Sequence, residues 1–146
     1  MTDERLATAA WESLYRAQVT VFRQLRADFP AGEVTLTEYD VLFNLSRQPR
    51  RQARIRDLTP QLLLSQPSVS RLIERLDKRG LVRRSDDPDD ARGTIVALTD
   101  AGLACFRRIG AQHSAWIAQR MSVLDAAELQ QLTELTTKLR MSGPAR

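Results

Sequence analysis

Residues 64–98 carry the strongest structural signal in the chain and read LSQPSVSRLIERLDKRGLVRRSDDPDDARGTIVAL. Apolar residues of the first part recur at helical spacing, at Val69, Leu72, Ile73 and Leu76. Ser65 is a favourable residue to cap the beginning of such a helix, and Gly80 is a typical residue just after its end. The sequence therefore predicts a helix from Gln66 to Arg79.

A β-hairpin is predicted directly after this helix. Residues 81–85 and 94–98 have the composition of short strands, and the eight residues between them, 86–93, are rich in turn formers. A short apolar helix, expected over residues 57–63 and weakened by Pro60, precedes the longer one. Two helices joined by a tight turn and followed by a basic hairpin form a winged helix–turn–helix.

Longer helices are expected on both sides of this unit. The apolar pattern predicts them over residues 2–29, 35–49, 99–121 and 125–140. Thr35 and Asp125 each begin a capping box, since a glutamate follows three positions later. The fold class is therefore mainly α with a small β-wing. We expect a single domain over residues 1–146, with the winged helix–turn–helix lobe at residues 35–99.

Composition limits the class of protein. The chain is 42% hydrophobic and 27% charged, as is typical of soluble globular proteins. It has no run of about 18 apolar residues and begins without a signal-peptide pattern, so we expect a cytoplasmic protein with no membrane partner. Its one cysteine, Cys105, excludes an intramolecular disulfide. We expect no metal, cofactor or enzymatic activity, because no ligand cluster or glycine-rich phosphate loop has suitable spacing.

The positive charge is concentrated in one third of the chain. The net charge is +4, and residues 47–92 carry twelve Lys and Arg against seven Asp and Glu. A solvated surface is the simplest interpretation of any charge run. A localised excess nevertheless favours a polyanionic partner, because DNA binding requires Lys and Arg to neutralise phosphates.

These motifs resemble those of the MarR (multiple antibiotic resistance regulator) family. The resemblance rests on residues 64–82, on the wing segment DPDDARG at 87–93 and on LTDAG at 98–102, in family order and spacing. With the flanking helix lengths, it covers essentially the whole chain. It implies a homodimeric transcriptional regulator that binds a pseudo-palindromic site on double-stranded DNA. It further implies a repressor that a small aromatic effector releases from DNA.

The resemblance also implies which residues contact DNA. Carried over by position, residues near the beginning of the recognition helix read the major groove, and Arg92 enters the minor groove. Arg71 is long enough to contact a guanine edge with two hydrogen bonds, although a contact to phosphate alone is a simpler alternative. The expected DNA-binding residues are Ser65, Gln66, Pro67, Ser68, Ser70, Arg71, Arg75, Arg92, Arg54 and Arg84.

The acidic tip of the hairpin is at first sight unfavourable for a DNA contact. We expect Asp90 to pair with an arginine of the wing or of the recognition helix and to orient it, while Arg92 projects into the minor groove. The simpler alternative is that the four aspartates of the tip only form the turn.

The terminal helices are expected to hold the dimer together. By resemblance, residues 1–29 and 104–141 interlock between two copies, and the dimer residues are Leu14, Val21, Leu129, Leu132, Leu135 and Leu139. Four aromatic residues are candidates for an effector pocket, namely Trp11, Tyr15, Tyr39 and Trp116. Aromatic residues at helical spacing more commonly belong to a core or a dimer interface. The only histidine, His113, is expected on a solvated helix surface.

Two other functions remain open at this point. One is a winged-helix module that binds a protein partner and not DNA, which would not need Arg71, Arg92 or the basic residues 50–56. The other is a thiol-based redox-sensing regulator that acts through Cys105. The peroxide-sensing branch of the family has its cysteine in the first helix, where this chain has none, and Cys105 has apolar neighbours.

Overall fold

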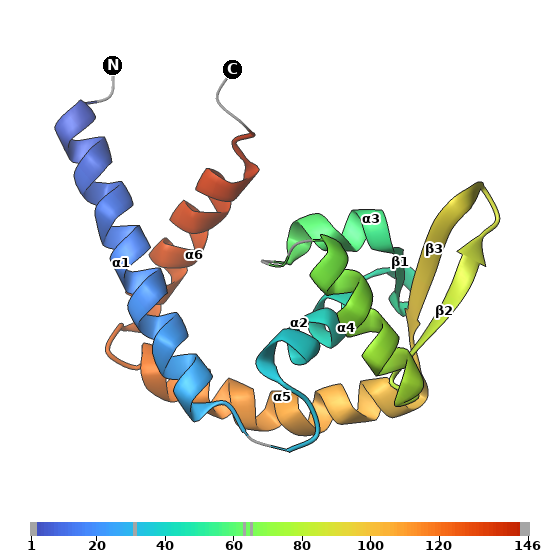
Figure 1. Cartoon of the computed structure of the whole chain (residues 1–146). Helices are drawn as coiled ribbons and strands as arrows, with labels where there is room; N and C mark the ends of the chain where they lie inside the picture. The colour runs from blue at the N-terminus through green and yellow to red at the C-terminus, as the bar shows by residue number, and fades with distance from the viewer. Residues whose placement is uncertain (1–2, 31, 63, 65, 144–146) are drawn as a thin grey trace. The chain divides into compact units, whose positions relative to one another are not determined.

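The computed structural model describes residues 3–30, 32–62, 64 and 66–143. The chain divides into two compact units, residues 1–109 and residues 110–146. The elements are helices and one small antiparallel sheet of three strands (Figure 1). This arrangement confirms the predicted fold class, a mainly α protein with a β-wing.

The first unit contains the winged lobe. Its elements are α1 (Glu4–Asp28), α2 (Leu36–Ser46), β1 (Gln52–Arg54), α3 (Ile55–Leu58), α4 (Gln66–Lys78), β2 (Val82–Asp87), β3 (Asp90–Leu98) and the first part of α5 (Asp100–Met121). A turn lies at Pro49–Arg51, and a one-turn 3₁₀ segment lies at Thr59–Gln61. The core is formed by fully buried side chains of α2, α3, α4 and the sheet, among them Leu42, Leu45, Leu58, Val69, Ile73, Leu76 and Val96.

Local sequence signals explain where the helices begin and end. The Thr35 hydroxyl accepts a hydrogen bond from the Glu38 backbone N–H at 3.2 Å, and the Glu38 carboxylate accepts one from the Thr35 N–H at 2.9 Å. Asp125 and Glu128 form the same reciprocal pair at the beginning of α6 (Ala126–Met141). Both predicted capping boxes are therefore confirmed.

The junction between the sheet and α5 explains the LTDAG motif. The Thr99 hydroxyl donates to the Gly80 carbonyl at 2.6 Å and accepts from the Gly102 N–H at 3.0 Å. At Gly102 the helix approaches the preceding loop so closely that a β-carbon would clash with the carbonyl oxygen of Leu81. The motif thus fixes α5 against the end of α4 in two ways. The Thr99 hydroxyl makes the hydrogen bonds, and Gly102 has no side chain and so allows the close approach.

The wing is longer and its tip shorter than the sequence predicts. Strand β3 lies between β1 and β2, and β2 pairs with it as far as Asp86 opposite Thr94 and Asp87 opposite Asp90. The expected eight-residue tip is therefore wrong. A register shift between Asp86 and Asp87 absorbs the extra residues. The Asp87 carboxylate accepts the Asp89 N–H at 2.9 Å, which closes a tight turn around Pro88.

Strand β1 was not expected, and α3 differs from its prediction. The turn into β1 places Arg50 and Arg51 in the left-handed region, with φ of 57° and 53°, where residues other than glycine are uncommon. The short helix begins at Ile55 instead of residue 57 and gives way to a 3₁₀ turn at Thr59. Pro60 accounts for this early end, because it has no N–H to continue the helix. Leu63, its expected last residue, lies outside the described residues.

The second unit consists of the rest of α5 and of α6. His113 is half-buried there, so its expected place on a solvated surface is wrong. Among the described residues, none of the helices combines the length and the apolar composition that crossing a membrane requires.

The burial of His113 predicts a contribution to the pH dependence of stability. Burial disfavours the imidazolium form and lowers the pKa of His113 below its ordinary value of 6.5. As the pH falls, the unfolded chain therefore binds the His113 proton before the folded chain does. His113 thus lowers the free energy of unfolding once the pH falls below about 6.5. We expect His113→Gln to lose less stability than the wild type between about pH 8 and about pH 5.5, measured by urea denaturation. Equal losses in the two proteins would contradict this assignment.

Candidate nucleic-acid interface

Helix α4 separates a core face from a polar face. Val69, Leu72, Ile73 and Leu76 are at most 2% exposed and pack into the core. Pro67, Ser70, Arg71, Glu74 and Arg75 are exposed. Gly80, with φ of 72°, ends the helix: its N–H donates to Asp77, and the N–H of Leu81 donates to Leu76, each at 3.0 Å. The core face of α4 and the backbone hydrogen bonds at its C-terminal end therefore hold the helix in place. Its polar face remains exposed and available to a ligand.

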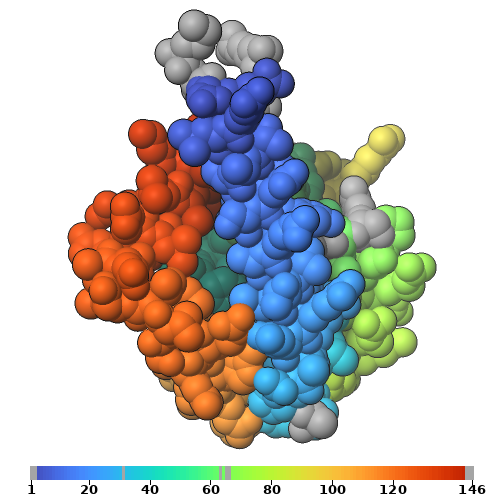
Figure 2. All heavy atoms as spheres, turned by 90° about the vertical axis from the view of Figure 1, so that its left-hand side faces the viewer, coloured from blue at the N-terminus to red at the C-terminus, as the bar shows by residue number. Residues whose placement is uncertain are grey.

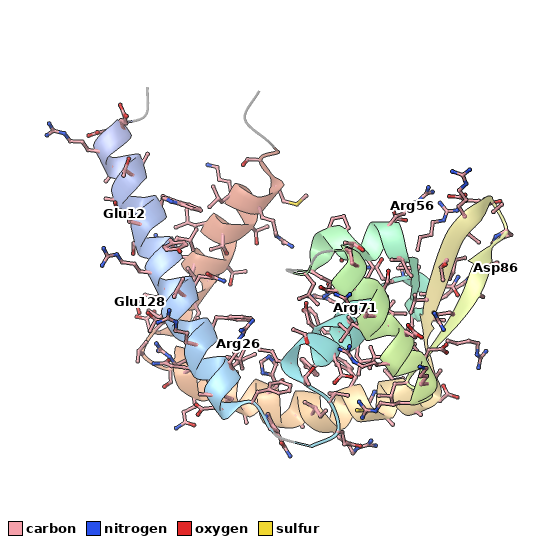
Figure 3. The ribbon with its side chains drawn as sticks, in the orientation of Figure 1. Glu12, Arg26, Arg56, Arg71, Asp86 and Glu128 are labelled. Atoms are coloured by element: carbon pink, nitrogen blue, oxygen red, sulfur yellow. The ribbon has the colours of Figure 1, made fainter. Side chains whose placement is uncertain are left out.

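Two arginines of this polar face are available for contacts. Figure 3 shows the side chains along α4, with Arg71 labelled. Within the described residues, neither Arg71 nor Arg75 has an ion-pair partner, whereas Lys78 lies 3.6 Å from Glu74. Ser68 is half-buried. Ser65 lies outside the described residues, as does the side chain of Gln66, so the structure does not place these two predicted contacts.

The wing presents Arg92 and uses its aspartates internally. Arg92 is exposed, and its backbone N–H donates to the Asp90 carboxylate at 3.0 Å. The other oxygen of Asp90 lies 3.4 Å from Arg56 of α3. The expected pairing of Asp90 with an arginine of the wing or of the recognition helix is therefore wrong. Asp90 instead shapes the turn before Arg92 and ties the wing to α3.

An ion pair with a buried carboxylate supports the tip of the wing. The Asp87 side chain is fully buried, and its Oδ2 lies 2.6 Å from Nε of Arg54. A second nitrogen of Arg54 reaches Asp89 at 3.4 Å. Arg54, which the sequence places with the DNA-binding residues, thus joins β1 to the wing. Arg84 is partly used in the same way, because its Nε lies 3.0 Å from Asp77 of α4. Arg54 therefore links two strands of the sheet, and Arg84 links the sheet to α4.

The aromatic candidates for an effector pocket differ in their surroundings. Trp11 and Tyr15 lie on α1 with ring centroids 6.2 Å apart and are mostly exposed. Tyr39 is buried between the rings of Phe29 and Phe106, with centroid distances of 5.6 and 5.5 Å, and burial raises its pKa. Tyr39 is therefore a core residue. Trp116 belongs to the second unit and is half-buried.

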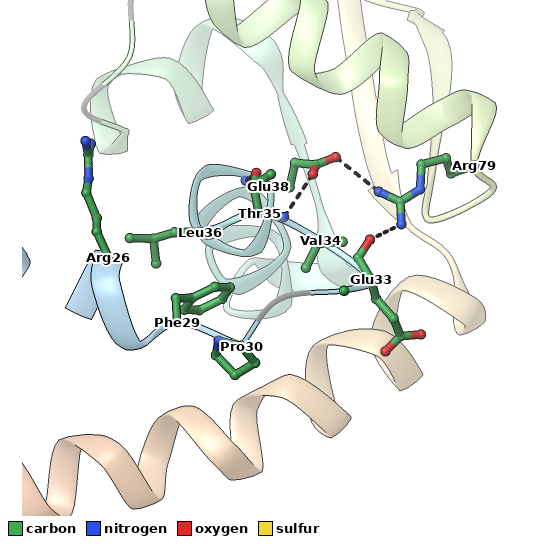
Figure 4. Close-up of a pocket in the computed structure, with 10 residues that line it drawn as sticks. Arg26, Phe29, Pro30, Glu33, Val34, Thr35, Leu36, Glu38 and Arg79 are labelled. Carbon is green, nitrogen blue, oxygen red and sulfur yellow. Dashed lines mark hydrogen bonds and ion pairs between the residues drawn. The ribbon is translucent and has the colours of Figure 1, made fainter. Parts of the chain in front are cut away.

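Sequence reasoning missed a pocket between the end of α1 and the beginning of α2. Its volume is about 410 Å³, and Figure 4 shows its walls. The lining residues are Arg26, Phe29, Pro30, Gly32, Glu33, Val34, Thr35, Leu36, Glu38 and Arg79. Only the capping box at Thr35 and Glu38 gave any sequence signal here, and that signal concerned a helix end.

Comparison with known proteins agrees with this geometry. The family model described as MarR family matches residues 33–93. The HTH-type transcriptional regulator YhbI of Bacillus subtilis is 26% identical over 143 residues, covering 95% of this chain and 92% of the relative. Sco3205, a MarR family transcriptional regulator from Streptomyces coelicolor solved in complex with DNA, is 29% identical. The match covers 96% of this chain and 89% of that chain, with a TM-score of 0.73.

A further similar structure holds a small molecule. The PcaV transcriptional regulator from Streptomyces coelicolor, in complex with its natural ligand, is 26% identical with a TM-score of 0.72, covering 97% of this chain and 99% of that chain. The three-stranded wing and the polar face of α4 define the class of winged helix–turn–helix transcriptional regulators. Within that class, the chain is similar to MarR family regulators, through the family model over residues 33–93 and through relatives that match most of its length.

Proposed function

We propose that this protein is a homodimeric repressor that binds a pseudo-palindromic DNA site. Two copies of α4 would enter successive major grooves, and Arg92 of each wing would enter the flanking minor groove. The observation that carries the proposal is which arginines are paired with acidic side chains and which are not. Arg71, Arg75 and Arg92 are exposed without acidic partners among the described residues, whereas Arg54 and Arg84 are engaged within the protein. A DNA partner would place the protein in the cytoplasm, and the proposal assigns it no enzymatic reaction.

The direct test is binding of the purified protein to the region upstream of its own gene. We expect footprinting to reveal a pseudo-palindromic site, and affinity should fall steeply as salt rises, because bound arginines release counterions from DNA. Binding no tighter than to random DNA of equal length would rule out sequence-specific regulation at that site. Full retention of DNA binding after loss of both Arg71 and Arg92 would instead overturn the assignment of these two arginines as reading residues.

Exposed apolar side chains support the dimer. Figure 2 shows α1, in blue, on the surface turned toward the viewer. Leu6 and Trp11 of that helix are 70% and 62% exposed. On α6, Leu135 and Leu139 are 59% and 58% exposed. Leu14, Val21 and Leu129 are half-buried in the single chain. Large apolar side chains of this kind on both terminal helices are typical of a surface that a second copy covers.

Charged substitutions on α6 should separate the protomers. Burial of a leucine contributes about 1.5–3 kcal/mol, and each residue occurs twice in a symmetric dimer. Leu135→Asp with Leu139→Asp should therefore raise the dimer dissociation constant at least about 100-fold. Light scattering after size-exclusion chromatography would measure the mass. Thr133→Asp with Thr137→Asp, two exposed positions on the opposite side of the same helix, serves as the charge-matched control. A doubly substituted protein that remains dimeric would exclude this face from the interface.

We propose that a small aromatic effector controls DNA binding. The family resemblance implies such an effector, and the similar regulator PcaV was solved with its natural ligand. Trp11 and Tyr15 remain candidates because they are exposed. Tyr39 can act only as part of the core behind such a site. Redox control through Cys105 is disfavoured, because its side chain is 1% exposed and burial raises the pKa of its thiol. Full oxidant sensitivity that is lost in Cys105→Ser would reverse that judgement.

A further inference from the structure

The recognition helix is anchored at its far end by one arginine. Arg79 follows the last residue of α4 and precedes Gly80, whose left-handed conformation turns the chain toward β2. The exposed residues that we propose to contact DNA begin at the other end of α4, at Pro67. Arg79 therefore acts on the orientation of the helix and lies away from its reading end.

Arg79 connects α4 to the beginning of α2. One guanidinium nitrogen donates to Oε2 of Glu38 at 3.2 Å, and the other donates to the backbone carbonyl of Glu33 (Figure 4). The Glu38 side chain is only 8% exposed. Its remaining oxygen accepts the Thr35 N–H that begins α2. A carboxylate buried to this extent needs its cation, which gives the contact a defined geometry.

The same contact extends to α5. The Glu33 carboxylate accepts two hydrogen bonds from Arg108, at 2.6 and 3.1 Å. The Arg108 hydrogen bond lowers the pKa of Glu33, so the carboxylate stays ionised at neutral pH. Glu33 therefore holds Arg108 with its side chain and Arg79 with its backbone. Three helices, α2, α4 and α5, meet through four residues.

We propose that Arg79 is a positioning residue for DNA recognition, and that the Glu38–Arg79–Glu33–Arg108 network sets the angle of α4. This inference rests on the proposed DNA-binding function. A helix rises about 1.5 Å per residue, so the 13 residues of α4 span about 20 Å. A tilt of about 5° at the anchored end would move the reading end by about 1.7 Å, enough to break hydrogen bonds to base edges.

This role differs from a phosphate contact in what it predicts for binding. A lost phosphate contact weakens operator and random DNA alike and reduces the slope of log affinity against log salt by about 0.9. A lost positioning contact weakens operator binding selectively, because only base reading depends on the helix angle. Simple destabilisation would lower the active fraction and reduce both affinities by the same factor.

The test compares Arg79→Gln with the wild type by fluorescence anisotropy on operator and random duplexes. We expect operator affinity to fall about tenfold, random-DNA affinity to change less than about twofold and the salt slope to stay unchanged. Arg107→Gln, an equal charge change at an exposed neighbour of Arg108, should leave both affinities within about twofold. Equal losses on both duplexes, or a reduced salt slope, would overturn the inference.

A double-mutant cycle identifies the partner. Glu38→Gln should reproduce much of the loss, and adding it to Arg79→Gln should cost little more, because both remove the same ion pair. Arg79→Lys should restore part of the operator affinity. If Arg79→Gln does not fold, Arg108→Gln loosens the network without leaving a buried charge, and a selective loss of about threefold is expected. Additive losses in the cycle, or no selective loss in Arg108→Gln, would contradict the network.

The two proposals fail in different ways. A wild-type protein that binds operator no better than random DNA would overturn the proposed function, and this inference with it. A wild type that discriminates, together with an Arg79→Gln variant that discriminates equally well, would overturn the inference alone.

Discussion

Replacing Arg71 with alanine is expected to weaken operator binding at least about thirtyfold. A guanidinium that makes two hydrogen bonds to a guanine edge contributes about 1–3 kcal/mol of discrimination. A symmetric dimer would lose this contact in both half-sites, and contacts in separate half-sites add. Arg71 is suited to the role because it is exposed on α4 with no ion-pair partner among the described residues.

Binding of Arg71→Ala to operator and random duplexes, at several salt concentrations, would measure this effect. Arg23→Ala, on the exposed side of α1, provides a control with the same loss of charge. If Arg71 contacts only phosphate, both affinities should fall together and the salt slope should drop by about two per dimer, one for each Arg71. Unchanged operator binding would remove Arg71 from the reading residues. Arg92→Ala, measured in parallel, should affect only the flanking base pairs, since it lies on a separate element.

Replacing Arg54 with alanine is expected to lower the free energy of unfolding by about 2–3 kcal/mol. The Asp87 side chain is fully buried 2.6 Å from this arginine, and removing one partner leaves a buried charge without compensation. Such losses cost about 3–5 kcal/mol when both partners are buried. Arg54 is one third exposed, so water can reach the site and reduce the cost.

Urea denaturation of Arg54→Ala, alone and combined with Asp87→Asn, separates the loss of the ion pair from the loss of packing. In the Asp87→Asn background the same substitution should cost only about 1 kcal/mol, because no charge is left buried. Arg83→Ala, which removes an exposed arginine of β2, should change stability by less than about 0.5 kcal/mol. A loss that is equal in both backgrounds would show that Arg54 stabilises the wing through packing and not through its charge.

The recognition helix was predictable because its signals are local. Apolar residues at helical spacing from Val69 to Leu76, and a glycine after the end, depend on neighbours within a few positions. The capping boxes at Thr35 and Asp125 were predictable for the same reason. The two strands of the wing could be located, but not the length of their pairing.

Features that depend on distant residues could not be predicted in this way. Strand β1 has three residues and exists because it pairs with β3, more than 40 positions later in the chain. The tip of the wing is short because the Asp87 carboxylate accepts the Asp89 N–H and faces Arg54 from another strand. A run of aspartates alone reads as an open turn.

The sequence thus places an arginine-rich winged lobe in residues 35–99 and predicts its recognition helix. It cannot assign a role to each arginine, because the sequence does not show which arginines are paired with carboxylates in the folded chain. Tertiary structure separates them: Arg54 and Arg79 meet carboxylates from distant segments and Arg84 meets Asp77, seven positions away, while Arg71 and Arg92 meet none among the described residues. The physical reason is that an ion pair needs two groups within about 4 Å, and only the folded chain brings residues 30 to 40 positions apart to that distance.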